Sequence, residues 1–548
     1  MRFVLLIFIA LITLVANAQQ NFYVVTFKDK NNSTYTISHP EEFLSQKAIE
    51  RRQRQKIKIN STDLPITYFY KKSIEDLGIK IRLEVKWFNA VVIQTTPDKL
   101  NSIQTLSCVA KIESLGPLPT YKSGNIKTLF KNETLTNLFT KKSSQAVDYG
   151  MAKSQIEQIN GNLLHNQGYL GQGMTIAVLD DGFKNLYDLS VFDNLRKSGH
   201  LKGVKDFSKN GNFLTSLDDS HGTEVLSLLT GNLNSTQIGT APEADYWLIR
   251  TEDAKAEYPL EEYNWAAGAI FADSVGVDII SSSLGYFEFD SPYASSNYTI
   301  DQLNGKTTLI SRAAEKATER GILVVNAAGN EGTTKWKKII APADVDSVLT
   351  VGAVNTAGTS ASFSSYGPSA DGRIKPDIAA TGYGTVLANP STNTLITGNG
   401  TSFSTPLIAG LCACLWQGNP SASNYDLLKA LRITASKSST PTDQMGFGIA
   451  NFYKAHLFLK KKEKVIASKP SFIVTPNPSK DKFDLIIMNN SILDWTIEIY
   501  SISGKLIERQ THIIPEKTIS IGDTLKSGIY LLRVMGGSEM AIEKIIKG

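Results

Sequence analysis

The sequence predicts an α/β protein built around a parallel sheet that is flanked by helices. Residues 174–179 form a continuous apolar run, which is typical of a parallel strand buried on both faces. A predicted strand at 246–250 is followed by a predicted helix at about 260–274 and later by another apolar run at 322–325, and this alternation favours a parallel sheet with crossover helices. The chain of 548 residues is long enough for further domains. We expect a small α+β unit before the sheet and a small β-sandwich after it.

Composition and charge are ordinary for a globular protein. The formal net charge of +5 is too small for this length to argue for nucleic-acid binding. The densest basic run, residues 51–58, falls in a predicted helix, and we expect it to be a solvated helix face rather than a nucleic-acid patch. Cys412 and Cys414 stand two apart on one predicted helix, so their side chains face different directions and cannot easily pair. We expect all three cysteines, Cys108 included, to be small buried hydrophobic residues.

The first residues have the pattern of an export signal. Arg2 is followed by an apolar run at 3–15 and then by Ala16-Asn17-Ala18, which matches a basic region, an apolar region and a cleavage site. We expect removal after Ala18. No later run is long enough to span a bilayer, so the mature protein should have no transmembrane segment.

An α+β unit is predicted next along the chain. Residues 22–27 indicate a strand, and Pro40 followed by two glutamates opens a helix that should run to about Arg54. The order βαββαβ follows from the remaining elements, which we expect at 79–85, 88–93, 97–106 and 109–113. Residues 118–148 are polar and rich in Lys, Thr, Ser and Asn, as a cleavable linker should be.

Asp180 and His221 are candidate catalytic residues, one at the end of a predicted strand and the other at the start of a predicted helix. Asp180 follows the run 174–179, and functional groups of an open α/β sheet gather beyond the carboxyl ends of its strands. An aspartate before a turn glycine is common, however. A lone histidine is usually structural, but His221 is the only one of six histidines followed by Gly-Thr at the mouth of a predicted helix, which favours a general base. Successive strand residues face opposite sides, so we expect Asp181 to lie in the turn instead.

Ser402 lies where a glycine-broken loop enters a predicted apolar helix at 407–416. At that place the unpartnered N–H groups and the positive end of the helix dipole can stabilise a developing oxyanion. Taken alone, a serine at the start of a helix is more often an N-cap. The other motifs of the chain favour a nucleophile over an N-cap at Ser402.

The segment 400–406, Gly-Thr-Ser-Phe-Ser-Thr-Pro, resembles the nucleophile motif of the subtilisin-like serine proteases. The segments around Asp180, His221 and Asn330 resemble the other motifs of that family and follow in its order. The resemblance implies a catalytic triad of Asp180, His221 and Ser402. It also implies an oxyanion hole formed by the side-chain amide of Asn330 and the backbone N–H of Ser402.

The resemblance extends to the substrate site. Ser283, Leu284 and Gly285 resemble the edge segment of these proteases, whose backbone pairs with an extended substrate while side-chain pockets discriminate. No metal-binding residues are predicted and no cofactor is expected. Calcium is common in the family, but we find no acidic loop with a recognisable ligand spacing.

The two flanking units have resemblances of their own. The βαββαβ unit resembles the inhibitory propeptides of these proteases. A parallel sheet with long crossovers folds slowly, which makes a folding template useful; the alternative is an unrelated N-terminal binding domain. At the other end, a Pro-Asn-Pro motif at 476–478, a Gly-Lys turn at 504–505, Gly-Ile-Tyr at 528–530 and a basic end resemble the C-terminal sorting domains of type IX secretion. The alternative there is a substrate- or carbohydrate-binding sandwich.

These observations divide the chain into a signal peptide (1–18), a propeptide with its cleavable linker (19–148), a subtilisin-like peptidase domain (149–459), and a charged linker with a sorting domain (460–548). Maturation should fall within 118–148. The predicted function is a serine endopeptidase made as a zymogen, which is exported through the periplasm and then secreted or attached to the cell surface.

The predicted partners are protein or peptide substrates, the chain's own propeptide as inhibitor, and the secretion machinery, with no nucleic acid. Two alternatives remain open at this point. One is a catalytically silent surface protein with the same fold, and the other is esterase or ligase chemistry on the same acyl-enzyme. Side-chain preference at the cleavage site does not follow from the sequence, because distant segments build the pocket walls.

Overall fold

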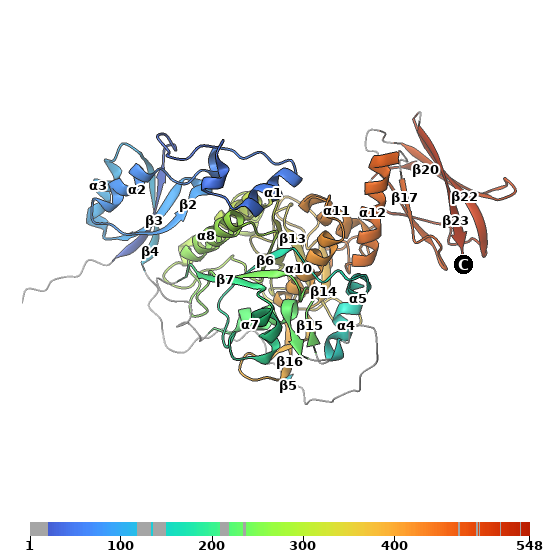
Figure 1. Cartoon of the computed structure of the whole chain (residues 1–548), viewed down its shortest axis with the longest axis horizontal. Helices are drawn as coiled ribbons and strands as arrows, with labels where there is room; N and C mark the ends of the chain where they lie inside the picture. The colour runs from blue at the N-terminus through green and yellow to red at the C-terminus, as the bar shows by residue number, and fades with distance from the viewer. Residues whose placement is uncertain are drawn as a thin grey trace, which may run out of the picture.

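The computed structural model describes residues 20–117, 133–134, 149–208, 219–233, 237–468, 472–488, 492, 494–515, 517–537 and 539–548. The predicted signal peptide and most of the predicted linker at 118–148 lie outside these residues. The described residues form a large central unit with a smaller unit on either side (Figure 1).

The central unit contains a sheet of seven strands in the order β14-β13-β12-β11-β6-β10-β7, and every neighbouring pair is parallel. The apolar run at 174–179 lies in the middle of this sheet as β6, buried throughout. The predicted α/β class is therefore confirmed. The strands are β6 (Thr175–Asp180), β7 (Leu201–Asp206), β10 (Asp245–Arg250), β11 (Ile279–Ser282), β12 (Leu323–Ala327), β13 (Leu349–Val354) and β14 (Ile378–Thr381).

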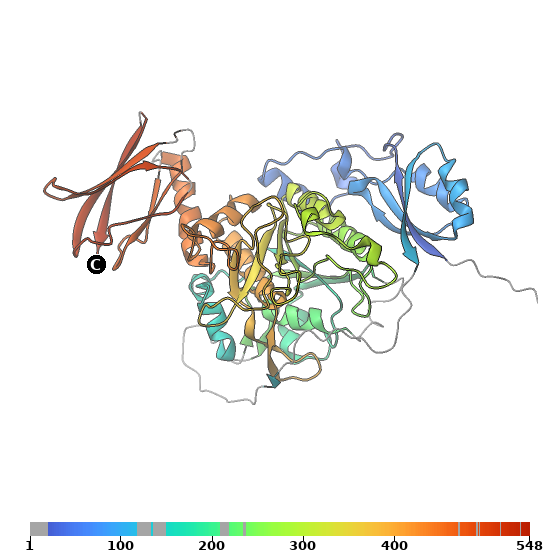
Figure 2. The same ribbon diagram turned by 180° about the vertical axis from the view of Figure 1, so that it is seen from behind.

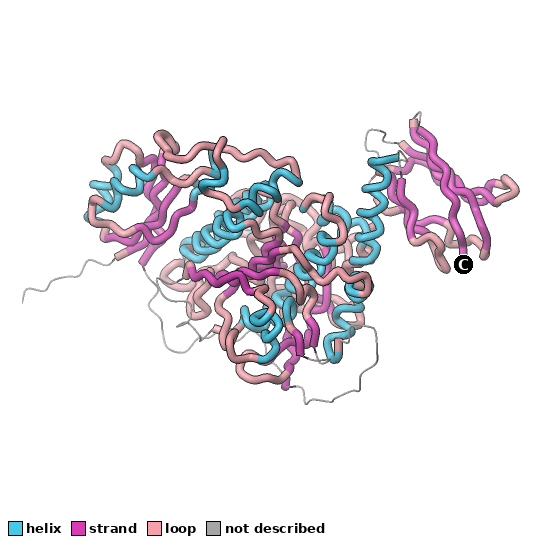
Figure 3. Tube along the Cα trace, viewed as in Figure 1, coloured by secondary structure: helices cyan, strands magenta, loops and turns pink. Residues whose placement is uncertain are grey.

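Helices cover both faces of the sheet (Figure 3). The chain passes from β6 outward to β7 and β10 and then returns to β11 on the other side of β6. The strand order reverses beside β6, and ligands of open α/β sheets bind at the carboxyl ends of the strands at such a reversal. One face carries α8 (Leu260–Val275) and α9 (Leu309–Glu319), and the other carries α7 (His221–Thr230), α10 (Thr401–Gln417), α11 (Asn424–Thr434) and α12 (Phe452–Ser468).

Shorter elements complete the central unit. A hairpin of β15 (Tyr383–Ala388) and β16 (Leu395–Asn399) leads directly into α10. The others are β5 (Glu133–Thr134), β8 (Asn232–Leu233), β9 (Gln237–Ile238), α4 (Lys153–Glu157), α5 (Gly161–His165) and α6 (Asp193–Lys197).

The N-terminal unit is an antiparallel sheet with α2 and α3 packed on one face, in the predicted βαββαβ order apart from the added helix α2, whereas α1 lies against α8 of the central unit. Ser45 accepts a hydrogen bond from Ala48 N at 3.2 Å and caps α1, so the predicted helix at 40–54 is split into a short 3-10 turn at Pro40–Glu42 and α1. The sheet order is β2-β3-β1-β4. Its elements are β1 (Asn21–Phe27), α1 (Gln46–Arg54), α2 (Tyr68–Glu75), β2 (Ile81–Val85), β3 (Ala90–Thr95), α3 (Leu100–Gln104) and β4 (Val109–Pro117).

The other face of this sheet, opposite α2 and α3, packs on the central unit. Phe22, Val24 and Leu83 belong to the same buried cluster as Trp265 on α8 and Ile310 on α9. Figure 2 shows the sheet resting on these helices from behind. The hydrophobic effect therefore holds the N-terminal unit in place over a continuous apolar core.

The basic run at 51–58 is only partly the solvated face that we predicted, because Arg54, Lys56 and Lys58 are exposed whereas Arg51 and Arg52 are buried. Arg51 and Arg52 are each only 1% exposed. Arg52 Nη2 lies 2.7 Å from Asp273 Oδ2 on α8, and Arg51 donates to Asp273 Oδ1. Asp63 accepts from Arg52 at 2.9 Å and from Arg320 at 2.9 Å. Two guanidinium groups of the N-terminal unit are thus desolvated and neutralised by carboxylates, one of which belongs to the central unit.

The carboxylate of Asp273 is fully buried between these guanidinium groups. Burial alone would raise the pKa of Asp273, but the charges of Arg52 and Arg51 outweigh it and hold the pKa below its ordinary value. Removing either partner would leave a buried charge with less compensation, which is strongly unfavourable. We call Arg51, Arg52, Asp63, Asp273 and Arg320 the interface ion cluster.

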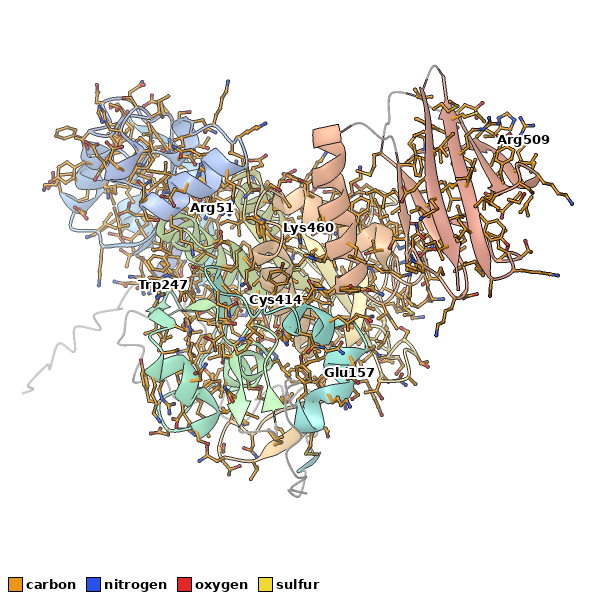
Figure 4. All side chains as sticks on the ribbon, turned by 45° about the vertical axis from the view of Figure 1, so that its right-hand side comes forward. Arg51, Glu157, Trp247, Cys414, Lys460 and Arg509 are labelled. Atoms are coloured by element: carbon orange, nitrogen blue, oxygen red, sulfur yellow. The ribbon has the colours of Figure 1, made fainter. Side chains whose placement is uncertain are left out.

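The C-terminal unit consists of two small antiparallel sheets. The charged run at 460–464, which we predicted as a linker, is part of α12, which continues to Ser468 (Figure 4). Lys454 on α12 contacts Asp484 of the sandwich at 2.9 Å. The sheets have the orders β17-β18-β21 and β20-β19-β22-β23. The strands are β17 (Phe472–Thr475), β18 (Phe483–Ile487), β19 (Trp495–Ser501), β20 (Leu506–Ile513), β21 (Ile519–Ile521), β22 (Gly528–Gly536) and β23 (Glu539–Lys547).

Among the described residues, no helix has both the length and the apolar character needed to cross a membrane.

Candidate active site

Asp180 and His221 meet at the carboxyl end of the central strand. Asp180 is the last residue of β6 and is fully buried, and His221 is the first residue of α7. Asp180 Oδ1 lies 2.8 Å from His221 Nδ1, which is hydrogen-bond distance. The imidazole is about a quarter exposed, so one side of the ring remains accessible.

Close backbone packing fixes this pair. A Cβ at Gly222 would lie 2.3 Å from Gly182 O and 3.0 Å from Asp180 Cβ, so only glycine lets α7 start this close to β6. Asp181 Oδ1 accepts a hydrogen bond from Gly222 N at 3.2 Å. The second aspartate therefore lies in the turn and bonds the backbone, while the first faces the histidine.

Ser402 is the second residue of α10, in the first turn of the helix, where N–H groups have no partner within the helix. Its side chain is largely buried at 6% exposure for the residue. Among the described residues, Ser402 Oγ donates a long hydrogen bond of 3.4 Å to Ser283 O. The ring of Phe403, the next residue, lies 5.9 Å from that of His221 between centroids. The structure thus places the residue after the serine against the histidine ring and the serine hydroxyl on a neighbouring carbonyl, and none of the hydrogen bonds among the described residues joins Ser402 Oγ to His221.

Asn330 reaches the same helix end from the loop after β12. Gly329 adopts φ 106°, a conformation that favours glycine, and a Cβ there would lie 2.8 Å from Ser365 Oγ. This turn directs Asn330 toward Thr401. Asn330 Oδ1 accepts hydrogen bonds from Thr401 N at 2.9 Å and from Thr401 Oγ1 at 3.1 Å. Because the amide oxygen is bound, its nitrogen is the group that can donate to a ligand.

The predicted substrate segment follows β11 and lies against Ser402. Ser283 Oγ donates to Ser402 O at 2.9 Å, and Asn326 Nδ2 donates to Leu284 O at 3.0 Å. A Cβ at Gly285 would lie 2.5 Å from Ile340 Cδ1, so this position packs tightly on the wall behind it. The segment is therefore held in one conformation next to the serine.

The acidic surroundings of His221 change its proton affinity. Burial alone would lower the pKa of His221, but the charge of Asp180, the hydrogen bond to it, and the charges of Asp181 and Glu224 together raise the pKa to about 10. Burial, together with the neighbouring charge of Asp180, raises the pKa of Asp181 well above its ordinary value. The site therefore favours an imidazolium beside a carboxylate.

Comparison with known proteins identifies the family of the central unit. The model of the subtilase family matches residues 171–449, about half of the chain. The chain belongs to the subtilase family. Subtilisin BL and subtilisin Savinase of Lederbergia lenta are both 31% identical over 309 residues, which cover 56% of this chain and 98% of each relative. Subtilisin E of Bacillus subtilis (strain 168) is 31% identical over 297 residues, which cover 54% of this chain and 67% of that protein.

The flanking units of this subtilase match families as well. Residues 22–128 match a Peptidase S8 propeptide domain of Bacteroidota, and residues 474–548 match a secretion system C-terminal sorting domain. The solved structure of the prenylagaramide maturation protease PagA is similar with a TM-score of 0.43 and 22% identity, and covers 55% of this chain and 98% of that one. The chain is thus a serine endopeptidase of the subtilisin type with a propeptide domain and a type IX sorting domain, and the sorting domain implies export with secretion or attachment to the cell surface.

Two groups of side chains in the described part of the subtilase have donor atoms within 4.8 Å of one another. One is Asp180, Asp181 and His221, and the other is Glu252, Glu257 and Glu261. In the second group, Glu252 accepts from Tyr286 Oη, and Glu261 accepts from the backbone of Asp253 and Tyr258. These carboxylates already bind protein donors. The absence of a cofactor stays a prediction.

Arg250 was predicted only as part of a strand. The available signal was an arginine at the end of a strand whose Leu248 and Ile249 are completely buried. A charged group in such a position needs a partner, because burial of an unpaired charge is costly. In the structure Arg250 lies at the same sheet edge as Asp180, its register partner on β6.

Proposed function

We propose that this subtilase is made as a zymogen and hydrolyses peptide bonds through an acyl-enzyme. The observation that carries the proposal is the 2.8 Å contact of Asp180 with His221, beside the N-terminus of the helix that holds Ser402. Asp180 orients the imidazole and stabilises its protonated form. His221 takes the proton of Ser402 while the serine oxygen attacks the scissile carbonyl, and water later hydrolyses the acyl-enzyme.

Two donors bind the oxyanion in this mechanism, namely Asn330 Nδ2 and Ser402 N. Their preorganisation is supported by the two hydrogen bonds that hold Asn330 Oδ1 on Thr401. Ser402 Oγ must exchange its 3.4 Å bond to Ser283 O for one to His221. Such a long bond is weak, and catalytic hydrogen bonds commonly tighten only when the substrate binds. The substrate pairs in extended form with the backbone of Ser283, Leu284 and Gly285.

The propeptide acts as the inhibitor in this proposal. The last described residue of β4 is Pro117, and its carbonyl oxygen accepts from Tyr293 Oη, on the loop that follows the substrate segment. The end of β4 therefore lies against the loop that follows the substrate segment. Because the interface ion cluster and the shared apolar core hold the unit on α8 and α9, cleavage of the linker alone leaves it bound.

Self-processing of the purified chain tests the proposed function. The proposal is supported if the chain loses its N-terminal unit only when Ser402 is present and then cleaves added peptides. A pure chain that neither processes itself nor cleaves peptides after the propeptide is removed contradicts it.

The pH–rate profile gives a second test. His221 acts as a base only when it is neutral, and the acidic groups that face it raise its pKa from 6.5 to about 10. We therefore expect kcat/KM to rise with pH through a midpoint above 6.5, so that activity is greatest under alkaline conditions. The measurement is kcat/KM on a peptide substrate between about pH 5 and 11. A flat profile between about pH 5 and 8 would count against His221 as the base.

The sorting domain is proposed to contact the secretion machinery and to carry the protein from the periplasm across the outer membrane. We expect a chain that ends after Lys469 to accumulate in the periplasm with its peptidase activity intact, because the catalytic residues lie in another unit. Cell fractionation followed by a peptidase assay measures both properties. Normal appearance of the shortened chain in the medium would refute the sorting role.

A further inference from the structure

Arg250 is a fully buried cation at the edge of the sheet that carries the active site. It is the last residue of β10 and has no exposed surface. In the sheet it lies opposite Asp180 on β6 and opposite Asp206 on β7. Its side chain therefore starts one strand away from the carboxylate that meets the histidine. None of the catalytic steps described above uses it.

The guanidinium of Arg250 connects the two segments that carry Asp180 and His221. Its Nε donates to the carbonyl oxygen of Asp181, the first residue of the turn after β6. Its Nη2 donates to Asp219 Oδ2, two residues before His221. Its Nη1 lies 3.7 Å from Asp206 Oδ2. One planar group thus contacts the aspartate turn and the histidine loop at once, with a fixed spacing between its donors.

We infer that Arg250, paired with Asp219, is a positioning residue that sets the distance between Asp180 and His221. The two segments also touch where Gly182 faces Asp219: a Cβ at Gly182 would lie 2.9 Å from Asp219 O. Asp219 therefore contacts the aspartate turn directly and through the arginine. A shift of either segment by about 1 Å would lengthen the 2.8 Å bond between Asp180 and His221, and displacements of that size can lower turnover on the order of 10²-fold.

The inference rests on the proposed triad, so its test uses only enzyme whose peptide cleavage is lost in Ser402→Ala. We expect Arg250→Met to lower kcat on the order of 10- to 100-fold with KM nearly unchanged, because substrate contacts lie on other segments. Arg250→Lys keeps the charge but cannot form both bonds in the same plane, so its kcat should fall between those of Arg250→Met and the wild type. Asp219→Asn should lower kcat several-fold.

Lys375→Met provides the matched control. Lys375 is also a completely buried cation, and its Nζ lies 2.8 Å from Asp377 Oδ2. The segments that carry Lys375 and Asp377 hold none of the proposed triad residues. We expect this variant to lose thermal stability while the folded enzyme keeps its kcat. Circular dichroism gives the folded fraction against which each kcat is normalised.

Three results would overturn the inference: a wild-type kcat in folded Arg250→Met, a fall in kcat no larger than that of Lys375→Met, or a rise in KM in place of the fall in kcat. If Arg250→Met does not fold, Arg250→Lys and Asp219→Asn decide the question, because both keep the size of the side chain close to that of the original. Wild-type kcat in both of these variants would equally reject a positioning role. Failure of the proposed function itself would differ, since the wild type would then show no cleavage that depends on Ser402.

Discussion

Ser402→Ala should leave an uncleaved precursor. Without the serine oxygen no acyl-enzyme forms, and loss of the nucleophile costs on the order of 10⁶ in turnover in related serine proteases. Self-processing that normally goes to completion would then be undetectable. The fold should survive, because the serine hydroxyl makes only a 3.4 Å bond to Ser283 O, while Ser283 Oγ still bonds the backbone of residue 402. Mass measurement on the purified chains, with no other protease present, gives the result.

Ser404→Ala is the control for this prediction. Ser404 lies in the same turn of α10, is completely buried, and donates to Thr401 O at 2.9 Å. Its removal perturbs the helix to a similar degree without touching the nucleophile, so processing should continue. Efficient cleavage of pure Ser402→Ala would show that another group acts as the nucleophile.

The local motifs of the site were predictable because each is defined within a few residues. An apolar run that ends in Asp180 predicts a carboxylate at the edge of a buried strand, and the structure has this arrangement. The Gly-Thr after His221 predicts a helix start, and α7 begins at His221. Both features depend on local patterning and on the rule that parallel strands present their carboxyl ends at the same edge.

The contacts that the sequence did not reveal join residues far apart in the chain. Arg51 and Arg52 were predicted to be solvated with the rest of the basic run, yet their partner Asp273 lies more than two hundred positions away in the chain. The helical periodicity of a basic run does not distinguish solvent from a buried carboxylate. Arg250 was missed for the same reason, since its partner Asp219 belongs to another segment.

The predicted linker at 460–464 was wrong, because a charged run was interpreted as the sign of a linker. The lysines at 460–464 continue α12, since lysine and glutamate are good helix formers and only packing on one side of the helix is needed. Phe458 and Leu459 belong to a buried cluster that also contains Ile473 of the sandwich. The predicted division at 459/460 therefore falls inside a helix that both units contact.

Asp180→Asn and Asp181→Asn should differ strongly in their effects. The two residues are adjacent, but Asp180 Oδ1 meets His221 Nδ1 at 2.8 Å, whereas Asp181 Oδ1 meets Gly222 N at 3.2 Å. Asparagine at 180 can present an NH₂ group to Nδ1, which favours the wrong tautomer of the imidazole and removes the charge that stabilises its protonated form. We expect a loss on the order of 10⁴ in kcat, as in other Ser-His-Asp proteases.

Asparagine at 181 keeps an oxygen that accepts from the backbone N–H of Gly222. It leaves the base and its orienting partner in place, so the loss in kcat should be much smaller. Because the charge of Asp181 helps to raise the pKa of His221, this variant should also move the pH–rate midpoint downward. Steady-state kinetics on both variants, matured by added wild-type enzyme that is then removed, compares them under the same conditions. A larger loss of kcat in Asp181→Asn than in Asp180→Asn would assign the triad carboxylate to Asp181.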